Sequence, residues 1–208
     1  LSSAASDVYK RQDAYDAICE KWCAQRSASP VNRCVAEFAQ SIARGGQVLD
    51  IGCGGGDPID RYLSGQGLQV TGIDRSDSMI EKARALRLPG ARFIVADVLE
   101  FAPESACDAV IAFDSLWHVP HAKQRSLYAR LSAWLKPGGG LLFTHGKAGG
   151  EIHGEMFGQT FYYSALDVGE VRALLEDAGL TIERCEVDYR EATTGERDLL
   201  VVARKAAR

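Results

Sequence analysis

The amino-acid sequence predicts an α/β fold built on a doubly wound, mostly parallel sheet. Residues 47–58 supply the first observation, an apolar run followed by a glycine-rich loop and the start of a helix. Short apolar runs then alternate with helical periodicity along most of the chain, which is typical of a parallel sheet covered on both faces. Aspartate follows four of the predicted strands, and such folds bind ligands at the carboxyl ends of their strands.

The glycine-rich loop follows the apolar run Gln47–Ile51 and holds four glycines between positions 52 and 56. Glycine tolerates positive φ and lets a ligand approach the backbone. Asp57-Pro58 then suits the first turn of a helix. The spacing fits neither the Gly-x-Gly-x-x-Gly dinucleotide fingerprint nor a P-loop, which ends in Gly-Lys-Ser/Thr. A glycine turn that only closes a strand–helix corner is the alternative interpretation.

Hydrophobic periodicity and Gly/Pro breaks place the other elements. We expect helices near 13–25, 31–43, 58–65, 77–86, 121–135 and 167–179, and strands near 47–51, 69–73, 92–96, 108–113, 140–144, 181–187 and 197–203. The last two strands can pair as an antiparallel hairpin at the sheet edge, which gives a seven-stranded sheet with an antiparallel last strand. The helices over 13–43 precede the sheet and are expected to act as a lid.

Residues 146–164 interrupt this alternation. The segment contains five glycines and four aromatic residues. Long segments without regular structure are often lids or binding loops, and the aromatic content disfavours disorder. We therefore expect an irregular loop that closes over a ligand site.

Composition limits the possible partners and compartments. The chain has 208 residues and a net charge of −4 without a Lys/Arg cluster, which argues against nucleic acid as a partner. No apolar run approaches membrane-spanning length, so we expect no membrane contact. No signal peptide is visible, and we expect a cytoplasmic protein that is a monomer or a homodimer. Residues 1–12 lack periodicity and resemble translated sequencing-adaptor sequence; we expect a non-native tail there and one domain over 13–208.

The six cysteines do not form a Cys-x-x-Cys motif, and we expect all of them to be reduced thiols. Cys19 and Cys23 lie one helical turn apart. They are either a metal or redox pair or two buried small residues.

The sequence Asp-x-Gly-x-Gly-x-Gly from Asp50 to Gly56 resembles the first motif of class I S-adenosylmethionine-dependent methyltransferases. The likeness covers about residues 13–205 and includes the turn Leu135–Gly139. It implies a Rossmann-like methyltransferase fold, S-adenosylmethionine as cofactor, S-adenosylhomocysteine as product, and a small-molecule acceptor methylated on O or N. A loop without Lys or Arg suits this cofactor, which has no phosphate and carries a sulfonium cation.

The resemblance also implies roles for individual residues. Asp74 follows the second strand, where a carboxylate can accept hydrogen bonds from two ribose hydroxyls. Asp97 is placed to accept from the adenine amine. Met79 either flanks the adenine or packs in the core, and Tyr15 either closes over the methionyl end of the cofactor or only packs. The expected cofactor residues are Tyr15, Asp50, Gly52, Cys53, Gly54, Asp74, Arg75, Met79, Asp97, Val98 and Phe113.

Methyl transfer is an in-line displacement in which positioning does much of the work, and a hydroxyl or ammonium acceptor must also lose a proton. His118 follows the fourth strand closely and is either this base or a cap of the next helix. His118 and His121 form an i, i+3 pair, but no third ligand is visible, so we expect no metal site. The expected catalytic residues are His118 and Asp114, and the expected acceptor-binding residues are Trp117, His118, His145, Tyr162 and Tyr163.

Two classes of function follow from these patterns. The first is a small-molecule methyltransferase. The second is a non-catalytic domain of the same fold that binds S-adenosylmethionine or a protein partner. A short-chain dehydrogenase is excluded, because it would need a Tyr-x-x-x-Lys pair and the sequence has none.

Overall fold

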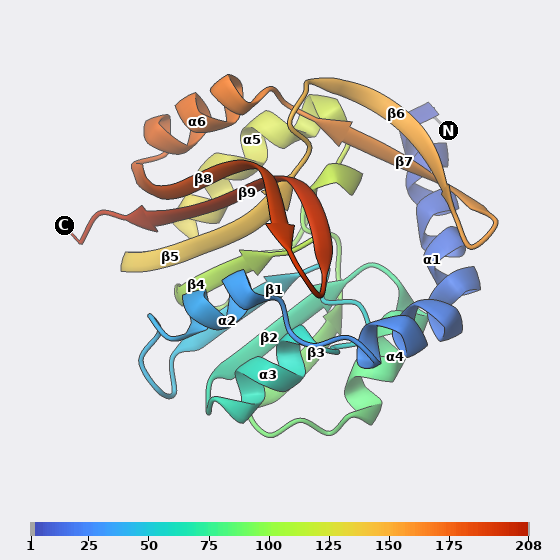
Figure 1. Cartoon of the computed structure of the whole chain (residues 1–208), viewed down its shortest axis with the longest axis horizontal. Coiled ribbons are helices and arrows are strands. Elements are labelled where there is room, and N and C mark those ends of the chain that lie inside the picture. Colours follow the sequence, from blue (N-terminus) through green and yellow to red (C-terminus); the bar gives the residue numbers. More distant parts are fainter. Residues whose placement is uncertain (1–2, 208) are drawn as a thin grey trace.

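A seven-stranded sheet with the strand order β3-β2-β1-β4-β5-β9-β8 forms the centre of the molecule (Figure 1). The computed structural model describes the backbone of residues 3–207 and the side chains of residues 13–207. β9 runs antiparallel to both β5 and β8, and the other neighbouring pairs are parallel, which confirms the predicted sheet. The strands are β1 (Gln47–Ile51), β2 (Gln69–Asp74), β3 (Ala91–Val95), β4 (Cys107–Ala112), β5 (Leu135–His145), β8 (Leu180–Glu191) and β9 (Gly195–Lys205).

Helices cover both faces of this sheet. Successive residues of a strand point to opposite faces, so Val110 packs in one buried cluster with α5 and α6, whereas Ile111 packs in another with α2 and α3. Strands buried on both faces explain the continuous apolar runs in the sequence. The helices are α1 (Ser3–Ser27), α2 (Arg33–Ala39), α3 (Ile59–Gly65), α4 (Asp77–Ala85), the short 3-10 turn η1 (Leu116–His118), α5 (His121–Ala133) and α6 (Val168–Asp177).

Helix α1 is longer than expected, because it begins at Ser3 rather than near residue 13. No glycine or proline occurs before Pro30, so nothing in the sequence interrupts the helix. Among residues 3–207, no helix combines the length and the apolar character needed to cross a bilayer.

The expectation of an irregular loop over residues 146–164 was wrong. The segment forms a hairpin of β6 (Gly150–Met156) and β7 (Gln159–Ala165). Its turn residues Phe157 and Gly158 both have positive φ, of 51° and 78°, as a two-residue hairpin turn requires. The glycines within β6 interrupt the alternation of apolar and polar residues that would predict a strand. In β7, Phe161 is fully buried against α1. The hairpin therefore supports the helix that precedes the sheet.

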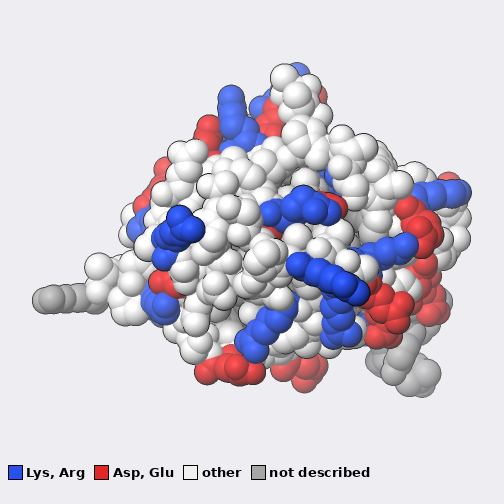
Figure 2. All heavy atoms as spheres, turned by 90° about the horizontal axis from the view of Figure 1, so that it is seen from below, with Lys and Arg blue, Asp and Glu red and all other residues white. Residues whose placement is uncertain are grey.

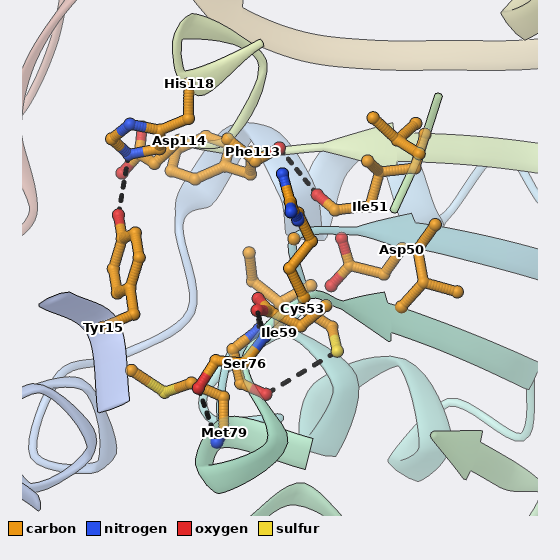
Figure 3. A pocket seen from close by; sticks show the side chains of 18 of the residues that line it. Tyr15, Asp50, Ile51, Cys53, Ile59, Ser76, Met79, Phe113, Asp114 and His118 are labelled. Atoms are coloured by element: carbon orange, nitrogen blue, oxygen red, sulfur yellow. Dashed lines mark hydrogen bonds between the residues drawn. The ribbon is translucent and has the colours of Figure 1, made fainter. Parts of the chain in front are cut away.

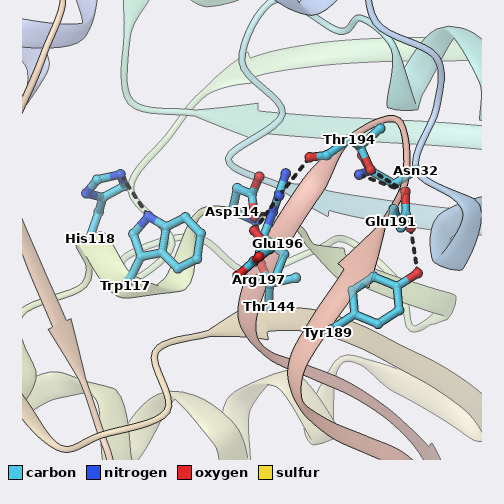
Figure 4. Close-up of polar contacts among 10 residues, drawn as sticks. All are labelled: Asn32, Asp114, Trp117, His118, Thr144, Tyr189, Glu191, Thr194, Glu196 and Arg197. Carbon is cyan, nitrogen blue, oxygen red and sulfur yellow. Dashed lines mark hydrogen bonds and ion pairs between the residues drawn. The ribbon is translucent and has the colours of Figure 1, made fainter.

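A buried carboxylate ties the C-terminal hairpin to α2. Glu191, at the end of β8, accepts hydrogen bonds from the backbone N–H of Cys34 at 3.1 Å, from the Tyr189 hydroxyl at 2.6 Å and from the Thr194 hydroxyl (Figure 4). Burial alone would raise the pKa of Glu191, but the hydrogen bonds outweigh it and lower this pKa to about 2. The carboxylate thus lies at the N-terminal end of α2, where negative charge is favourable.

Glu191→Gln should destabilise the fold by about 3 kcal/mol near neutral pH, because the pKa of the carboxyl falls by more than two units on folding. Because the pKa of Glu191 is lowered in the folded state, the carboxylate stabilises the fold at pH values above the ordinary glutamate pKa. This contribution is lost as the pH falls toward 2. Urea unfolding should show the gap between parent and variant narrowing by about 1 kcal/mol from about pH 7 to about pH 3.5. Glu176→Gln, at an exposed position on α6, is the control. A gap that does not change with pH would contradict the assignment.

Candidate active site

A pocket opens at the carboxyl ends of β1, β2, β3 and β4 (Figure 3). Its walls are the glycine loop after β1, the residues that follow β2, β3 and β4, and one face of α1. Parallel strands bring their carboxyl ends to the same edge of a sheet, which explains why segments far apart in the sequence meet here. All eleven expected cofactor residues, with Asp114 and His118, line this pocket: Tyr15, Asp50, Gly52, Cys53, Gly54, Asp74, Arg75, Met79, Asp97, Val98 and Phe113.

The glycine loop has a shape that only glycine adopts easily. Gly52, Gly54 and Gly56 have φ of 74°, 55° and 82°. A Cβ added to Gly52 would lie 2.4 Å from the Cβ of Ser115, so this glycine allows the loop to pack on the segment after β4. A Cβ added to Gly54 would meet only the indole nitrogen of Trp22, at 3.7 Å, within the part of the chain that the structure describes. The backbone at Gly54 is therefore open to the pocket.

The carboxylate of Asp74 holds this loop in place. Its oxygens accept the backbone N–H of Gly54 at 3.0 Å and of Ser76 at 2.9 Å. Burial raises the pKa of Asp74, and these N–H groups oppose the rise. Asp97 lies in the same pocket and forms an ion pair with Arg75, whose Nη1 is 3.3 Å from Oδ2 of Asp97. Two of the expected cofactor residues therefore contact each other. Strand-end carboxylates and the open loop thus share one wall.

His118 lies in the pocket on the short turn η1, with both ring nitrogens hydrogen-bonded. Nδ1 is 3.0 Å from the backbone carbonyl of Tyr162, which can only accept, so Nδ1 carries the proton. The indole N–H of Trp117 donates to Nε2 at 3.2 Å (Figure 4). The Tyr15 hydroxyl lies 2.7 Å from the same nitrogen (Figure 3). The ring is therefore neutral, and Nε2 is its basic atom.

An aromatic cluster surrounds this histidine from three elements. The ring of Tyr15 on α1 lies 4.8 Å from that of Phe161 on β7, and the ring of His118 lies 5.0 Å from that of Tyr163. Tyr162 contributes its backbone carbonyl, while its hydroxyl accepts from the N–H of His121 and donates to Glu151. These contacts join α1 to the β6–β7 hairpin above the pocket.

Three of the expected acceptor-binding residues contact His118 but do not themselves line the pocket: Trp117, Tyr162 and Tyr163. Their expected role in acceptor binding stays a prediction, and in this structure they contact the histidine. Of the five expected acceptor-binding residues, only His118 faces the pocket directly.

The expectation that His145 binds an acceptor was wrong. Its side chain is fully buried, with Nε2 3.2 Å from Oε1 of Gln124 on α5 and Nδ1 3.1 Å from the carbonyl of Gly146. Burial lowers the pKa of His145 and favours the neutral ring. The preceding residue, Thr144, points the other way and contacts Asp114. The alternation along β5 therefore directs His145 into the helical layer.

Asp114 lines the pocket, but its carboxylate is engaged. Nε of Arg197 on β9 lies 2.6 Å from Oδ1, and the Thr144 hydroxyl donates to the same oxygen at 3.0 Å (Figure 4). Asp114 also has a positive φ of 56°. The Asp114 carboxylate is therefore already hydrogen-bonded to two side chains, whereas His118 lines the same pocket from η1.

Helix α1 contributes pocket residues that the sequence analysis missed. Trp22, Cys23 and Arg26 line the pocket together with Tyr15. Trp22 and Arg26 lie seven and eleven residues after Tyr15, which places all three on one face of a helix. This spacing is the feature of the sequence that predicts Trp22 and Arg26 as neighbours of Tyr15. The helix is fixed to α4 by the Ser76–Asp16 hydrogen bond and by the Lys82–Glu20 ion pair at 2.5 Å. An arginine therefore enters a pocket that is otherwise rich in carboxylates.

The two cysteines of α1 are free thiols. Their sulfur atoms lie 4.0 Å apart, and the thiol of Cys23 donates to the sulfur of Met79 at 3.7 Å. Burial raises the pKa of Cys23 to about 12, so the thiol stays protonated. Among residues 13–207, no three His, Cys, Asp or Glu side chains gather in a way that would hold a metal ion.

Comparison with known proteins adds sequence relatives. A family described as "Methyltransferase domain" matches residues 48–139. Trans-aconitate 2-methyltransferase of Acidovorax sp. (strain JS42) is 41% identical over 97 residues, which are 44% of this chain and 35% of that protein. The 27-O-demethylrifamycin SV methyltransferase of Amycolatopsis mediterranei (strain S699) is 32% identical over 158 residues, or 70% of this chain and 57% of that protein. The chain thus spans less than two thirds of the length of these relatives.

Solved structures share the fold over nearly the whole chain. The 1,6-didemethyltoxoflavin-N1-methyltransferase of Burkholderia thailandensis, solved with its acceptor and S-adenosylhomocysteine, superposes with a TM-score of 0.74 at 22% identity, covering 99% of this chain and 92% of that one. A S-adenosylmethionine-dependent methyltransferase from Methanosarcina mazei gives 0.69 at 24% identity, covering 86% and 100%. At this level of identity the likeness establishes the fold.

Proposed function

We propose that this chain is a class I S-adenosylmethionine-dependent methyltransferase and that it transfers a methyl group from S-adenosylmethionine to an oxygen or nitrogen atom of a small molecule. One observation carries the proposal. The open glycine loop, the strand-end carboxylates of Asp74 and Asp97, and the basic Nε2 of His118 all line a single pocket.

The residues of the pocket fit the chemistry of this cofactor. The backbone at Gly54 leaves space that a side chain would fill. Asp74 suits the two ribose hydroxyls, and Asp97 suits the adenine amine, because carboxylates accept strong hydrogen bonds from both kinds of donor. Asp50 and Arg26 supply opposite charges for the ammonium and carboxylate ends of the methionyl group. The pocket therefore offers a complementary group for each polar part of the cofactor.

The bound cofactor supplies an electrophilic methyl group on its sulfonium sulfur. The protein then has to orient the acceptor and receive its proton. Nε2 of His118 is the basic atom for this step, because the Tyr162 carbonyl holds the ring proton on Nδ1. The Tyr15 hydroxyl, 2.7 Å from Nε2, occupies the place that an acceptor hydroxyl or amine would take beside this nitrogen.

The packing around the pocket, the charge of the chain and its sequence relatives support a small acceptor. Helix α1 and the β6–β7 hairpin pack together over the aromatic cluster. On the face shown in Figure 2, several Lys and Arg groups lie near the middle, and Asp and Glu groups lie toward the right and lower borders. The net charge of −4 does not favour nucleic acid as the partner. The two sequence relatives are named for trans-aconitate and for 27-O-demethylrifamycin SV, which are small molecules.

Calorimetry with S-adenosylmethionine, followed by turnover with small hydroxyl, carboxylate and amine acceptors, tests the proposal. We expect binding and the formation of S-adenosylhomocysteine with at least one acceptor class. Binding without turnover on a broad panel would favour the non-catalytic domain instead. A folded chain that does not bind the cofactor would refute the proposal.

His118→Ala and Tyr163→Ala should each lower turnover by roughly tenfold or more, with cofactor affinity nearly unchanged. The first variant removes the base, and the second removes the ring that packs against it at 5.0 Å. His121→Ala is the control, because its side chain does not line the pocket while its backbone N–H still reaches Tyr162. Full activity of His118→Ala across the pH range would remove His118 as the base, and unfolding of Tyr163→Ala would favour a packing role.

A further inference from the structure

Asp60 on α3 is a buried acid without a hydrogen-bond donor. Its side chain is fully buried, and no N–H or O–H among residues 13–207 donates to either of its carboxyl oxygens. An ionised carboxylate in this position would lose its hydration without compensation, which costs several kcal/mol. The neutral acid is therefore the form of Asp60 that this environment favours.

The carboxyl group of Asp60 faces that of Asp50 on β1. Asp50 is only 2% exposed and lines the pocket (Figure 3). Two ionised carboxylates are both acceptors, so they can be joined only by a proton that one of them carries. The pair thus resembles two acids that share a site and cannot both ionise.

The charged and titratable groups that face this pair come from several elements. Asp57 and Cys53 belong to the segment between β1 and α3, Asp74 ends β2, and Arg26 approaches from α1. Arg26 is the cation of this set, and it also faces Asp114. Burial is the main cause of two shifts: it raises the pKa of Asp60 well above its usual range, and it raises the pKa of Asp50 to about 7. The surroundings therefore favour protons on the pair.

We propose that Asp60 is a positioning residue that stays protonated and donates its O–H to the Asp50 carboxylate, and that cofactor binding expels the proton that Asp50 carries in the cofactor-free protein. The proposal rests on the proposed function, because the cationic cofactor is what favours ionised Asp50. The balance is simple: the O–H bond of Asp50 breaks, its proton passes to solvent, and Asp60 keeps its own proton.

A direct consequence is proton release on binding. Below about pH 7, most cofactor-free molecules carry a proton on Asp50, and each binding event must displace it. Cofactor affinity should then fall as the pH is lowered from about 7 to about 5.5, approaching tenfold for each pH unit. Calorimetry in two buffers of different ionisation enthalpy should count about one proton released for each S-adenosylmethionine bound at about pH 6.

Two substitutions of Asp60 separate its possible roles. Asp60→Asn keeps the shape and an N–H donor, so it should bind the cofactor within a few-fold of the parent. Asp60→Leu removes the donor and should weaken binding at neutral pH by about tenfold or more. In this variant the proton release should also persist at about pH 8, where the parent releases little, because ionised Asp50 has lost its donor.

The outcomes are distinguishable. Binding by the parent without proton release at about pH 6 would overturn this inference alone. Equal weakening in Asp60→Asn and Asp60→Leu would also overturn it, because it would show that the negative charge of Asp60 is what matters. If Asp60→Leu does not fold, the proton count of the parent still decides. Absence of cofactor binding by the parent would instead refute the proposed function, and this inference with it.

Discussion

Gly54→Val should abolish cofactor binding while the chain stays folded. The backbone at Gly54 faces the pocket with φ of 55°, and its added Cβ would point toward Trp22 at 3.7 Å. The two methyl groups of valine would fill the space between the glycine loop and α1 that the cofactor needs. The left-handed conformation costs valine about 1–2 kcal/mol, which is small beside the stability of a typical domain. Calorimetry should then show no heat of binding in a protein with a normal circular dichroism spectrum.

Three comparisons make this result interpretable. Gly54→Ala adds only the Cβ and should give weaker but measurable binding. Gly169→Val, on α6 with no atom within 4 Å of an added Cβ, is the control for replacing an exposed glycine. Gly52→Ala should instead destabilise the fold, because its Cβ would lie 2.4 Å from that of Ser115. Normal binding by folded Gly54→Val would show that this loop is not the cofactor site.

Local signals were sufficient to predict the sheet and one wall of the pocket. The glycine loop after β1 and the aspartates at strand ends are encoded by adjacent residues, and parallel topology alone brings them together. For this reason Asp50, Asp74 and Asp97 were predicted from position, and all three line the pocket. The opposite wall was harder, because α1 reaches it through packing between distant segments. Trp22 and Arg26 were missed although they share a helical face with Tyr15.

The errors have physical causes of the same kind. A strand end identifies the edge of a sheet, but the alternation of side chains decides which face a residue reaches. Thr144 therefore meets Asp114, whereas the next residue, His145, enters the helical layer against Gln124. The sequence of β6 favours a loop, because glycine is rare within strands and occupies two of the seven positions of β6. The turn at Phe157 and Gly158 specifies the hairpin only once its positive φ angles are known.

Asp74→Ala should weaken cofactor binding by about 2–4 kcal/mol, or roughly 30- to 1000-fold, through the loss of two charge-assisted hydrogen bonds to the ribose. The structure adds a second effect. Asp74 also accepts the N–H groups of Gly54 and Ser76, so alanine should lower stability by about 1–2 kcal/mol. Asp74→Asn, which keeps one acceptor oxygen, should lose less of both.

The two effects are separable with a matched control. Asp167 also accepts the N–H of a loop glycine, Gly149, at 2.9 Å, but it lies outside the pocket. Asp167→Ala should therefore reproduce part of the stability loss without any loss of cofactor affinity. Urea unfolding and calorimetry on the same samples supply both measurements. If Asp74→Ala binds S-adenosylmethionine as tightly as the parent, the ribose assignment fails. If both variants lose affinity equally, the effect comes from loop order rather than from direct contact, because the shared feature is a glycine N–H left without its acceptor.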